Sequence, residues 1–302
     1  MALKDIKAKI QSTERTHKVT RAMEAVSAVK MRKTQQAAFA DRPYARAALS
    51  ILARLSSSAD LARHPLTETR EVKRTALVVI TSDKGLAGAL NSGVIQVTHK
   101  FLAAKAKDTV EIFAVGRKGE DFFRRRDFTI MKTVPNKNDD VDLSAMELLS
   151  QELSEGFLEE NYDEVVVAYS NFKSTFEQIP TLRTLLPLSV IELEKLVADI
   201  PPEKGKFSEA QKIESAPVYT VEPSGEEVLG ALVPQLVAVS LYHMLLEAKA
   251  SEHSARMVAM KNASDKSKEV AHDLTRLFNK IRQAAITREV SEIVSGREAL
   301  AP

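Results

Sequence analysis

The first 55 residues constrain the fold most, because almost nothing in them interrupts a helix. Glycine is absent from Leu3 to Leu55, and Pro43 is the only proline there. Small or apolar residues recur at helical spacing: Leu3, Ile6, Ile10, Thr13, Thr16, Val19, Met23, Val26, Val29, Ala48, Leu52 and Leu55. The pattern predicts one long helix that Pro43 is able to kink. At 1.5 Å per residue, about 53 residues extend roughly 80 Å, too far to be enclosed in a small domain.

A second long helix is predicted at the other end of the chain. Ser224 and Glu227 have the spacing of a capping box, and apolar periodicity begins directly after them. A 4-3 repeat then runs without a slip through Val239, His243, Leu246, Ala250, His253, Met257, Met260, Ser264, Ser267, Ala271, Leu274, Phe278, Ile281 and Ala285. This repeat predicts a coiled coil, although a seam of Ala, Ser, His and Met is weaker than one of Leu and Ile.

Between these helices the period changes to alternating strands and helices. Runs rich in β-branched residues predict strands at 75–81, 111–116 and 163–170, with helical stretches near 86–106 and 143–160. This order predicts a central Rossmann-like α/β domain with a mainly parallel sheet. The expected organisation is an N-terminal coiled-coil helix at 1–58, the α/β domain at 74–199, a polar loop and connecting strand at 200–223, and a C-terminal coiled-coil helix at 224–296.

The two terminal helices have two ways to pair. An antiparallel coiled coil of the N- and C-terminal helices within one chain is the economical arrangement. Homodimerisation through the same seams is the rival interpretation. The fold class expected is therefore α/β, with a long antiparallel coiled coil added to the central domain.

Composition excludes several classes of protein. The chain has no cysteine, so disulfides and thiolate metal sites are excluded. The N-terminus is charged throughout and lacks the apolar core of a secretory signal. We find no window near the roughly 18 to 20 uninterrupted apolar residues that a membrane-spanning helix requires. Any membrane association is therefore expected to go through partners.

Charge is divided unevenly along the chain. Residues 1–58 carry twelve Lys or Arg against four Asp or Glu, a net charge of +8, whereas residues 134–164 have a net charge of −9. A basic helix of this kind indicates an acidic partner, although a solvated helix face is the simpler interpretation. Nucleic acid is not favoured as that partner, because the helix has almost no interleaved aromatic residues.

No set of residues assembles into an active site in the sequence. The best candidate for ligand binding, the loop at 81–88, matches neither a P-loop nor the glycine spacing of a dinucleotide turn. We interpret it as a structural strand-to-helix turn. His243 with Glu247, and His253 nearby, make a metal site geometrically possible, but seam residues that set register are the better interpretation. We therefore expect no catalytic residue, no cofactor and no bound metal.

Five stretches of the sequence are more specific than these patterns. They lie at 18–31 (KVTRAMEAVSAVKM), 80–91 (ITSDKGLAGALN), 182–188 (LRTLLPL), 247–260 (EAKASEHSARMVAM) and 278–296 (FNKIRQAAITREVSEIVSG). Together they strongly resemble the gamma subunits of F-type ATP synthases, in the family's order and over essentially the whole chain. The stretch at 278–296 is the most diagnostic.

The resemblance implies a non-catalytic rotor that couples proton flow to ATP synthesis or hydrolysis in the beta subunits. It implies alpha and beta subunits, an epsilon subunit and a ring of c subunits as partners. It also implies a peripheral location on the cytoplasmic face of the bacterial inner membrane. By the family pattern, Met23, Arg256, Gln283 and Thr287 contact the beta subunits. The alternatives are a homodimeric coiled-coil scaffold and a nucleotide-binding α/β protein.

Overall fold

The computed structural model describes residues 3–40, 64–136, 143–189, 191 and 225–299. These residues form two compact units, which we describe separately. The first unit joins residues 1–27 to residues 257–302, and the second comprises residues 28–256. Pro43, the rest of the helix expected up to residue 58, the loop expected at 200–223 and the capping residue Ser224 lie outside the described residues.

The second unit is built on one five-stranded sheet with the order β3-β2-β1-β4-β5. The strands β1 to β4 are parallel, and β5 runs antiparallel to β4. The strands are β1 (Thr75–Ile80), β2 (Val110–Val115), β3 (Ile130–Val134), β4 (Glu164–Ser174) and β5 (Glu177–Leu186). All six residues of β1 are buried, because it is the central strand and is covered on both faces. The expected mainly parallel, Rossmann-like sheet is confirmed.

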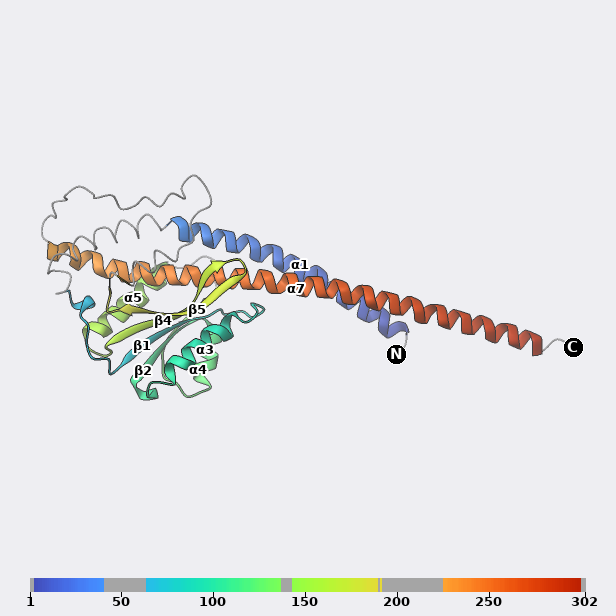
Figure 1. Ribbon diagram of the computed structural model, residues 1–302, viewed down its shortest axis with the longest axis horizontal. Coiled ribbons are helices and arrows are strands. Elements are labelled where there is room, and N and C mark those ends of the chain that lie inside the picture. Colours follow the sequence, from blue (N-terminus) through green and yellow to red (C-terminus); the bar gives the residue numbers. More distant parts are fainter. Residues whose placement is uncertain (1–2, 41–63, 137–142, 190, 192–224, 300–302) are drawn as a thin grey trace. The chain divides into compact units, whose positions relative to one another are not determined.

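Different helices cover the two faces of this sheet (Figure 1). The helices α3 (Leu90–Leu102) and α4 (Arg117–Arg124) cover one face, where Val94, Leu102 and Phe123 join the apolar side chains of the strands. The helix α5 (Leu143–Leu158) and the first part of α7 (Gly225–Ala299) cover the other face. Two short 3-10 helices, η2 (Pro65–Thr67) and η3 (Lys107–Thr109), lie in the connections.

Three of these elements were not predicted from the sequence. The strand β3 has no continuous buried run, since its residues are alternately half-buried and exposed. The strand β5 contains Pro180 and Arg183, which weaken its strand pattern, although it is an edge strand where proline is tolerated. The helix α4 is short and highly charged, with Arg117, Lys118 and Arg124 among its eight residues. In each case the local pattern is too short or too polar to predict the element.

The first part of α7 is the core helix of the second unit. Nearly every residue from Ser240 to Ser254 is buried, and Leu229, Val233 and Leu241 are almost inaccessible. The expectation that no segment is apolar enough to span a membrane was therefore too strict. An 18-residue window within Glu227–Arg297 has a mean hydropathy of 1.7, but half of that window is buried inside the protein. Its apolar side chains cover the sheet, as those of a core helix do.

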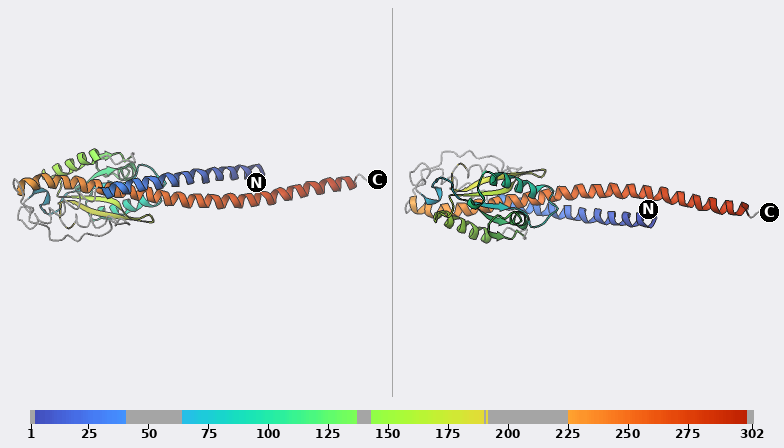
Figure 2. Two further views of the ribbon diagram at one scale, coloured as in Figure 1. Left: turned by 90° about the horizontal axis from the view of Figure 1, so that it is seen from above. Right: turned by 90° about the horizontal axis from the view of Figure 1, so that it is seen from below.

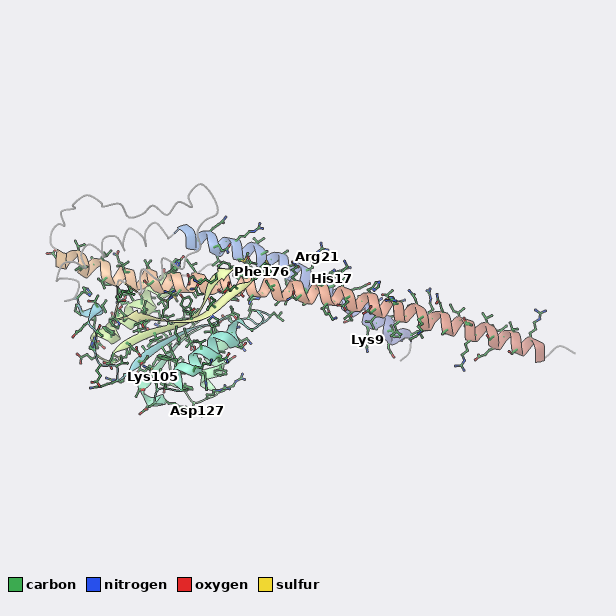
Figure 3. The ribbon with its side chains drawn as sticks, in the orientation of Figure 1. Lys9, His17, Arg21, Lys105, Asp127 and Phe176 are labelled. Carbon is green, nitrogen blue, oxygen red and sulfur yellow. The ribbon has the colours of Figure 1, made fainter. Side chains whose placement is uncertain are left out.

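The first unit consists of two paired helices, the beginning of α1 (Leu3–Ala40) and the end of α7. Figure 2 shows these segments side by side and antiparallel, with the two chain ends pointing the same way. His17 of α1 contacts α7 directly, with its Nδ1 atom 2.9 Å from the Ser264 hydroxyl and 3.0 Å from the Ser264 carbonyl (Figure 3). The expected pairing within one chain is confirmed.

The seam expected on α7 is also confirmed in this unit. The buried or half-buried residues follow the 4-3 repeat, with exposed residues between most of them: Met257, Met260, Ser264, Ser267, Ala271, Leu274, Phe278 and Ile281. The last expected seam residue, Ala285, is exposed. The pairing surface therefore ends near Ile281, while α7 continues to Ala299.

The apolar stripe expected on α1 is wrong after Thr13 except at Met23, which is half-buried. Val19, Val26 and Val29 are 58%, 53% and 68% exposed. The five most buried positions of α1 lie on a strict 4-3 repeat whose other members are half-buried: Ile6, Ile10, Thr13, His17, Thr20, Glu24, Ser27, Met31 and Thr34. The error arose because the true seam becomes polar at His17, whereas apolarity moves to a neighbouring face of the helix. Beyond Thr13 the seam positions are polar except for Met31, which is 7% exposed.

Candidate functional site

The carboxyl edge of the parallel strands is where a doubly wound sheet usually binds ligands. Here the loops at this edge bond to one another. Thr81 follows β1, and its backbone N–H donates to the Val115 carbonyl at 2.7 Å. The Thr81 carbonyl accepts a hydrogen bond from the Asn136 side-chain amide at 2.8 Å. The loops after β1, β2 and β3 are thus tied together by buried hydrogen bonds.

The N-terminus of α4 is also satisfied from within the protein. Its free N–H groups would be the natural donors to a phosphate at this edge. Instead, the N–H of Arg117 donates to the Asp83 carboxylate at 2.8 Å, and the N–H of Gly119 donates to the Thr81 hydroxyl at 2.8 Å. The N–H of Lys118 donates to the Ser82 carbonyl. The 81–88 loop was expected to be a structural strand-to-helix turn, and its first residues also cap α4.

Gly116 makes this capping possible. Its φ of +95° lies in the region that favours glycine, and an added Cβ would lie 2.0 Å from the Thr81 carbonyl oxygen. Any side chain at this position would collide with backbone and push the β1 loop away from α4. Gly85, by contrast, has no atom within 4 Å of the position that a Cβ would take.

Three charged residues of α7 close the same edge from the other side. Lys249 donates from its ammonium to the Asn136 carbonyl at 2.9 Å. Arg256 points its guanidinium at the Gly85 carbonyl, at 3.4 Å. Glu252 lies between the two cations and bonds Arg256 at 2.7 Å, with the Lys249 ammonium 3.7 Å away. All three are buried, so this ionic cluster fixes α7 to the loops after β1 and β3.

Sequence analysis missed the roles of Lys249 and Glu252. Their spacing was the available signal, because Lys249, Glu252 and Arg256 are three and four residues apart and therefore lie on one helix face. The neighbouring side chains are small, including those of Ala250 and Ser251. Charged residues at helical spacing among small residues indicate a face that contacts another element closely.

A second group of buried polar side chains lies between α7 and the last two strands. His243 and Glu247 of α7 are separated by 3.5 Å between Nε2 and Oε1, and both are buried. Tyr169 of β4 is fully buried, and burial together with the Glu247 carboxylate raises the pKa of its hydroxyl well above the usual value. Among the described residues, no group of three or more His, Asp or Glu is arranged to hold a metal. His243 and Glu247 therefore form a buried pair within the core.

The four residues expected to contact beta subunits fall into different settings. Gln283 and Thr287 are exposed on α7, one helical turn apart and on the same face. Met23 of α1 is half-buried. Arg256 is only 8% exposed, and its guanidinium is engaged by Glu252 and Gly85. Only Gln283 and Thr287 are thus brought together as an accessible pair.

These features define a class of protein. A pair of antiparallel helices made from the two ends of one chain occurs together with an α/β domain whose ligand-binding edge is filled by its own side chains. This combination is typical of a structural subunit.

Comparison with known proteins identifies the family. The family model described as ATP synthase matches residues 2–300. The ATP synthase gamma chain of Roseiflexus castenholzii is 43% identical over 302 residues, covering 99% of this chain and 98% of that protein. The gamma chain of Moorella thermoacetica is 40% identical and covers 99% of each. The chain belongs to the ATP synthase gamma chain family and is a non-catalytic subunit of that complex.

Solved structures agree with this assignment. A chain from the central stalk and c-ring structure of Tetrahymena thermophila mitochondrial ATP synthase has a TM-score of 0.60 and 26% identity, covering 82% of this chain and 99% of that one. A chain of Euglena gracilis mitochondrial ATP synthase has a TM-score of 0.64 at 18% identity, covering 99% and 94%. The second likeness shows the fold.

Proposed function

We propose that the chain is the rotor of a bacterial ATP synthase and couples proton flow to ATP synthesis or hydrolysis at the beta subunits. Its partners in this proposal are the alpha and beta subunits, the epsilon subunit and the ring of c subunits. It works at the cytoplasmic face of the inner membrane, held there by these partners. The gamma chain names of its bacterial relatives and the central stalk title of the Tetrahymena structure support the proposal.

The observation that carries the proposal is the pairing of the two chain ends through His17 and Ser264. A helix pair made from two different sequences presents different side chains in every direction. When such a pair stands inside a ring of repeated subunits, it contacts each of them differently. Differential contact is what shifts a conformational equilibrium, so each orientation favours a different nucleotide affinity at each site.

The exposed surface of α1 fits an acidic surrounding. Eight cations on this helix are exposed: Lys4, Lys7, Lys9, Arg15, Lys18, Arg21, Arg32 and Lys33, of which Lys9 and Arg21 are labelled in Figure 3. Exposed charges act over about 8 Å at physiological salt and need no fixed contact geometry. They would attract acidic loops of a surrounding ring without holding one angle.

The alternatives fit less well. In a homodimeric scaffold the seams would be filled by a second chain, whereas here Ser264 meets His17 of the same chain. In a nucleotide-binding protein the α4 N-terminus would be open, whereas here its N–H groups bond Thr81, Ser82 and Asp83.

The proposed contacts with beta subunits remain Met23, Arg256, Gln283 and Thr287. Gln283 and Thr287 need no rearrangement, because both are exposed. The Arg256 guanidinium would have to leave Glu252 or share it with a carboxylate of the partner. A forked guanidinium is able to bond two carboxylates at once, so sharing is the simpler arrangement.

The first test is purification of the native complex and identification of the chains that elute with this one. Alpha and beta subunits are expected, and elution of this chain with itself alone would support the homodimer instead. The second test compares ATP synthesis in inverted vesicles. Gln283→Ala/Thr287→Ala should lower the rate about fivefold with assembly intact, as expected for the ~1 kcal/mol of a lost hydrogen bond. Glu289→Ala, exposed on another face of α7, is the matched control.

A further inference from the structure

A groove of about 690 Å³ runs between α3 and α4 on the outer surface of the sheet domain. It lies on the face of the sheet opposite to the one that α5 and α7 cover (Figure 1). The α3 wall carries Asn91, Ser92, Ile95, Gln96 and His99, and the α4 wall carries Lys118, Asp121, Phe122, Arg125 and Arg126. A volume of this size holds several side chains, far more than a single ion.

The α4 wall is cationic and largely unneutralised. Lys118, Arg125 and Arg126 are exposed. The one carboxylate on this wall, Asp121, lies 3.6 Å from the guanidinium of Arg117. Within the described part of the chain, the side chains of Lys118 and Arg125 have neither an ion pair nor a hydrogen bond. The wall therefore offers two uncompensated cations to whatever enters the groove.

The floor of the groove is apolar and recessed. Ile95 and Phe122 are half-buried, and the Arg126 guanidinium lies over the Phe122 ring at 3.6 Å from its centroid. A flat bilayer surface would not reach a recessed floor. A protruding peptide with at least one apolar side chain fits this shape.

The spacing of the lining residues favours a helical occupant. On α3 the lining residues Asn91, Ile95 and His99 lie on successive turns of one helix face. Lys118 and Phe122 do so on α4, and Arg125 is the residue directly after that helix. Two neighbouring helices form ridges and grooves into which a third helix fits. From residue 91 to residue 99 the groove extends about 12 Å, which matches roughly eight helical residues.

We propose that the α3–α4 groove binds a short acidic amphipathic helix of a protein partner. An apolar side chain of that helix lies on Ile95 and Phe122. Its Asp or Glu side chains lie along one side and pair with Lys118 and Arg125, while the other side faces the uncharged α3 wall. The asymmetry of the two walls sets the direction in which the helix lies.

The test uses the full chain and a fluorescent twelve-residue helical peptide with leucines on one face and glutamates beside them. Fluorescence anisotropy should show binding of this peptide and none of a matched peptide with lysine in place of glutamate. Lys118→Glu/Arg125→Glu should weaken binding at least tenfold. Lys261→Glu/Arg276→Glu, the same charge change at exposed positions of α7, should change it less than twofold.

Lys118, Arg125, Lys261 and Arg276 are all exposed, so both double variants should fold. Circular dichroism will verify this. Should the charge reversal unfold the chain, Lys118→Gln/Arg125→Gln replaces it and should weaken binding at least threefold. Absence of peptide binding, equal weakening by the two double variants, or displacement of the peptide by inorganic phosphate or by vesicles of anionic lipid would overturn the proposal. The latter two ligands would identify a general anion site or a membrane contact.

Discussion

The Glu252 carboxylate lies 2.7 Å from the Arg256 guanidinium, one turn away on α7, and 3.7 Å from the Lys249 ammonium. One buried anion thus holds two buried cations that bond separate loops of the sheet domain. Glu252→Gln removes the negative charge beside both buried cations, so we expect a loss of about 3 kcal/mol in the free energy of unfolding. Urea unfolding of the full chain measures it.

Glu269→Gln is the matched control for this prediction. Glu269 also bonds a lysine of α7, Lys266, at 2.8 Å, but both side chains are exposed. An exposed pair contributes at most about 0.5 kcal/mol on a helix surface. Equal losses in the two variants would mean that the buried cluster is no more than a set of ordinary ion pairs.

Gly116→Ala should destabilise the α/β domain by at least about 2 kcal/mol, because alanine meets both an unfavourable φ and the Thr81 carbonyl. Gly85→Ala, in the same group of loops, should change stability by less than about 1 kcal/mol. Thermal unfolding followed by circular dichroism compares them. A Gly116 variant as stable as the Gly85 variant would show that the loop after β1 moves aside at little cost in free energy.

The pairing of the chain ends is testable with introduced cysteines, since the protein has none of its own. In His17→Cys/Ser264→Cys, a short bismaleimide should join the two thiols within one chain and give a faster-migrating monomer on a denaturing gel. Val19→Cys/Ser264→Cys should react little within the chain, because Val19 is exposed on another face of α1. Mainly dimeric products from the first variant would favour pairing between chains.

Asp163 should make stability depend on pH in acid. Burial alone would raise the pKa of its carboxyl, but hydrogen bonds from the N–H groups of Arg74 and Lys73, and nearby arginine charges, lower it below the usual 3.8. Its contribution is therefore complete above pH 3.8 and disappears as the pH falls through the lowered folded-state pKa.

Asp163→Asn should accordingly cost about 1 kcal/mol at pH 7, a modest value because the carboxylate is partly exposed. Urea midpoints at pH 7 and pH 2.5 measure the change. The difference in urea midpoint between Asp163→Asn and the parent protein should be smaller at pH 2.5 than at pH 7. If the difference in urea midpoint is the same at both pH values, the ionised carboxylate is excluded as the cause of the destabilisation.

The free chain should bind ATP no more tightly than millimolar. The donors at the α4 N-terminus are occupied by Thr81, Ser82 and Asp83, so a phosphate would have to displace all three. Isothermal titration of the pure chain with ATP tests it. Micromolar affinity would show that the sheet edge opens.

The sequence predicts an element well where one physical requirement dominates. After Thr75 the run of β1 is apolar because that strand is buried on both faces, and the repeat of α7 is regular because a seam needs a constant period. It predicts poorly where contacts come from elsewhere in the chain. The strand β3 is held by pairing with β2, and Arg183 of β5 is buried beside α7 and β4, which no local pattern reveals.

The same distinction applies to the candidate site. The absence of a phosphate motif at 81–88 could be read directly, because that chemistry needs glycines at fixed spacing. The closure of the edge by Lys249, Glu252 and Arg256 could not, because it depends on which loops lie beside α7. Family resemblance pointed to Arg256 as a contact with beta subunits, which stays a prediction, and its neighbours within the chain required the structure.

The exposed valines of α1 have a consequence for handling the protein. Val19, Val26 and Val29 recur at spacings of seven and three, so they form an apolar stripe on one side of a highly basic helix. In dilute buffer the cations keep separate copies apart. Added salt screens that repulsion, so the valine stripes of separate copies are able to associate. Concentrated solutions of the isolated chain should therefore become turbid as the ionic strength rises.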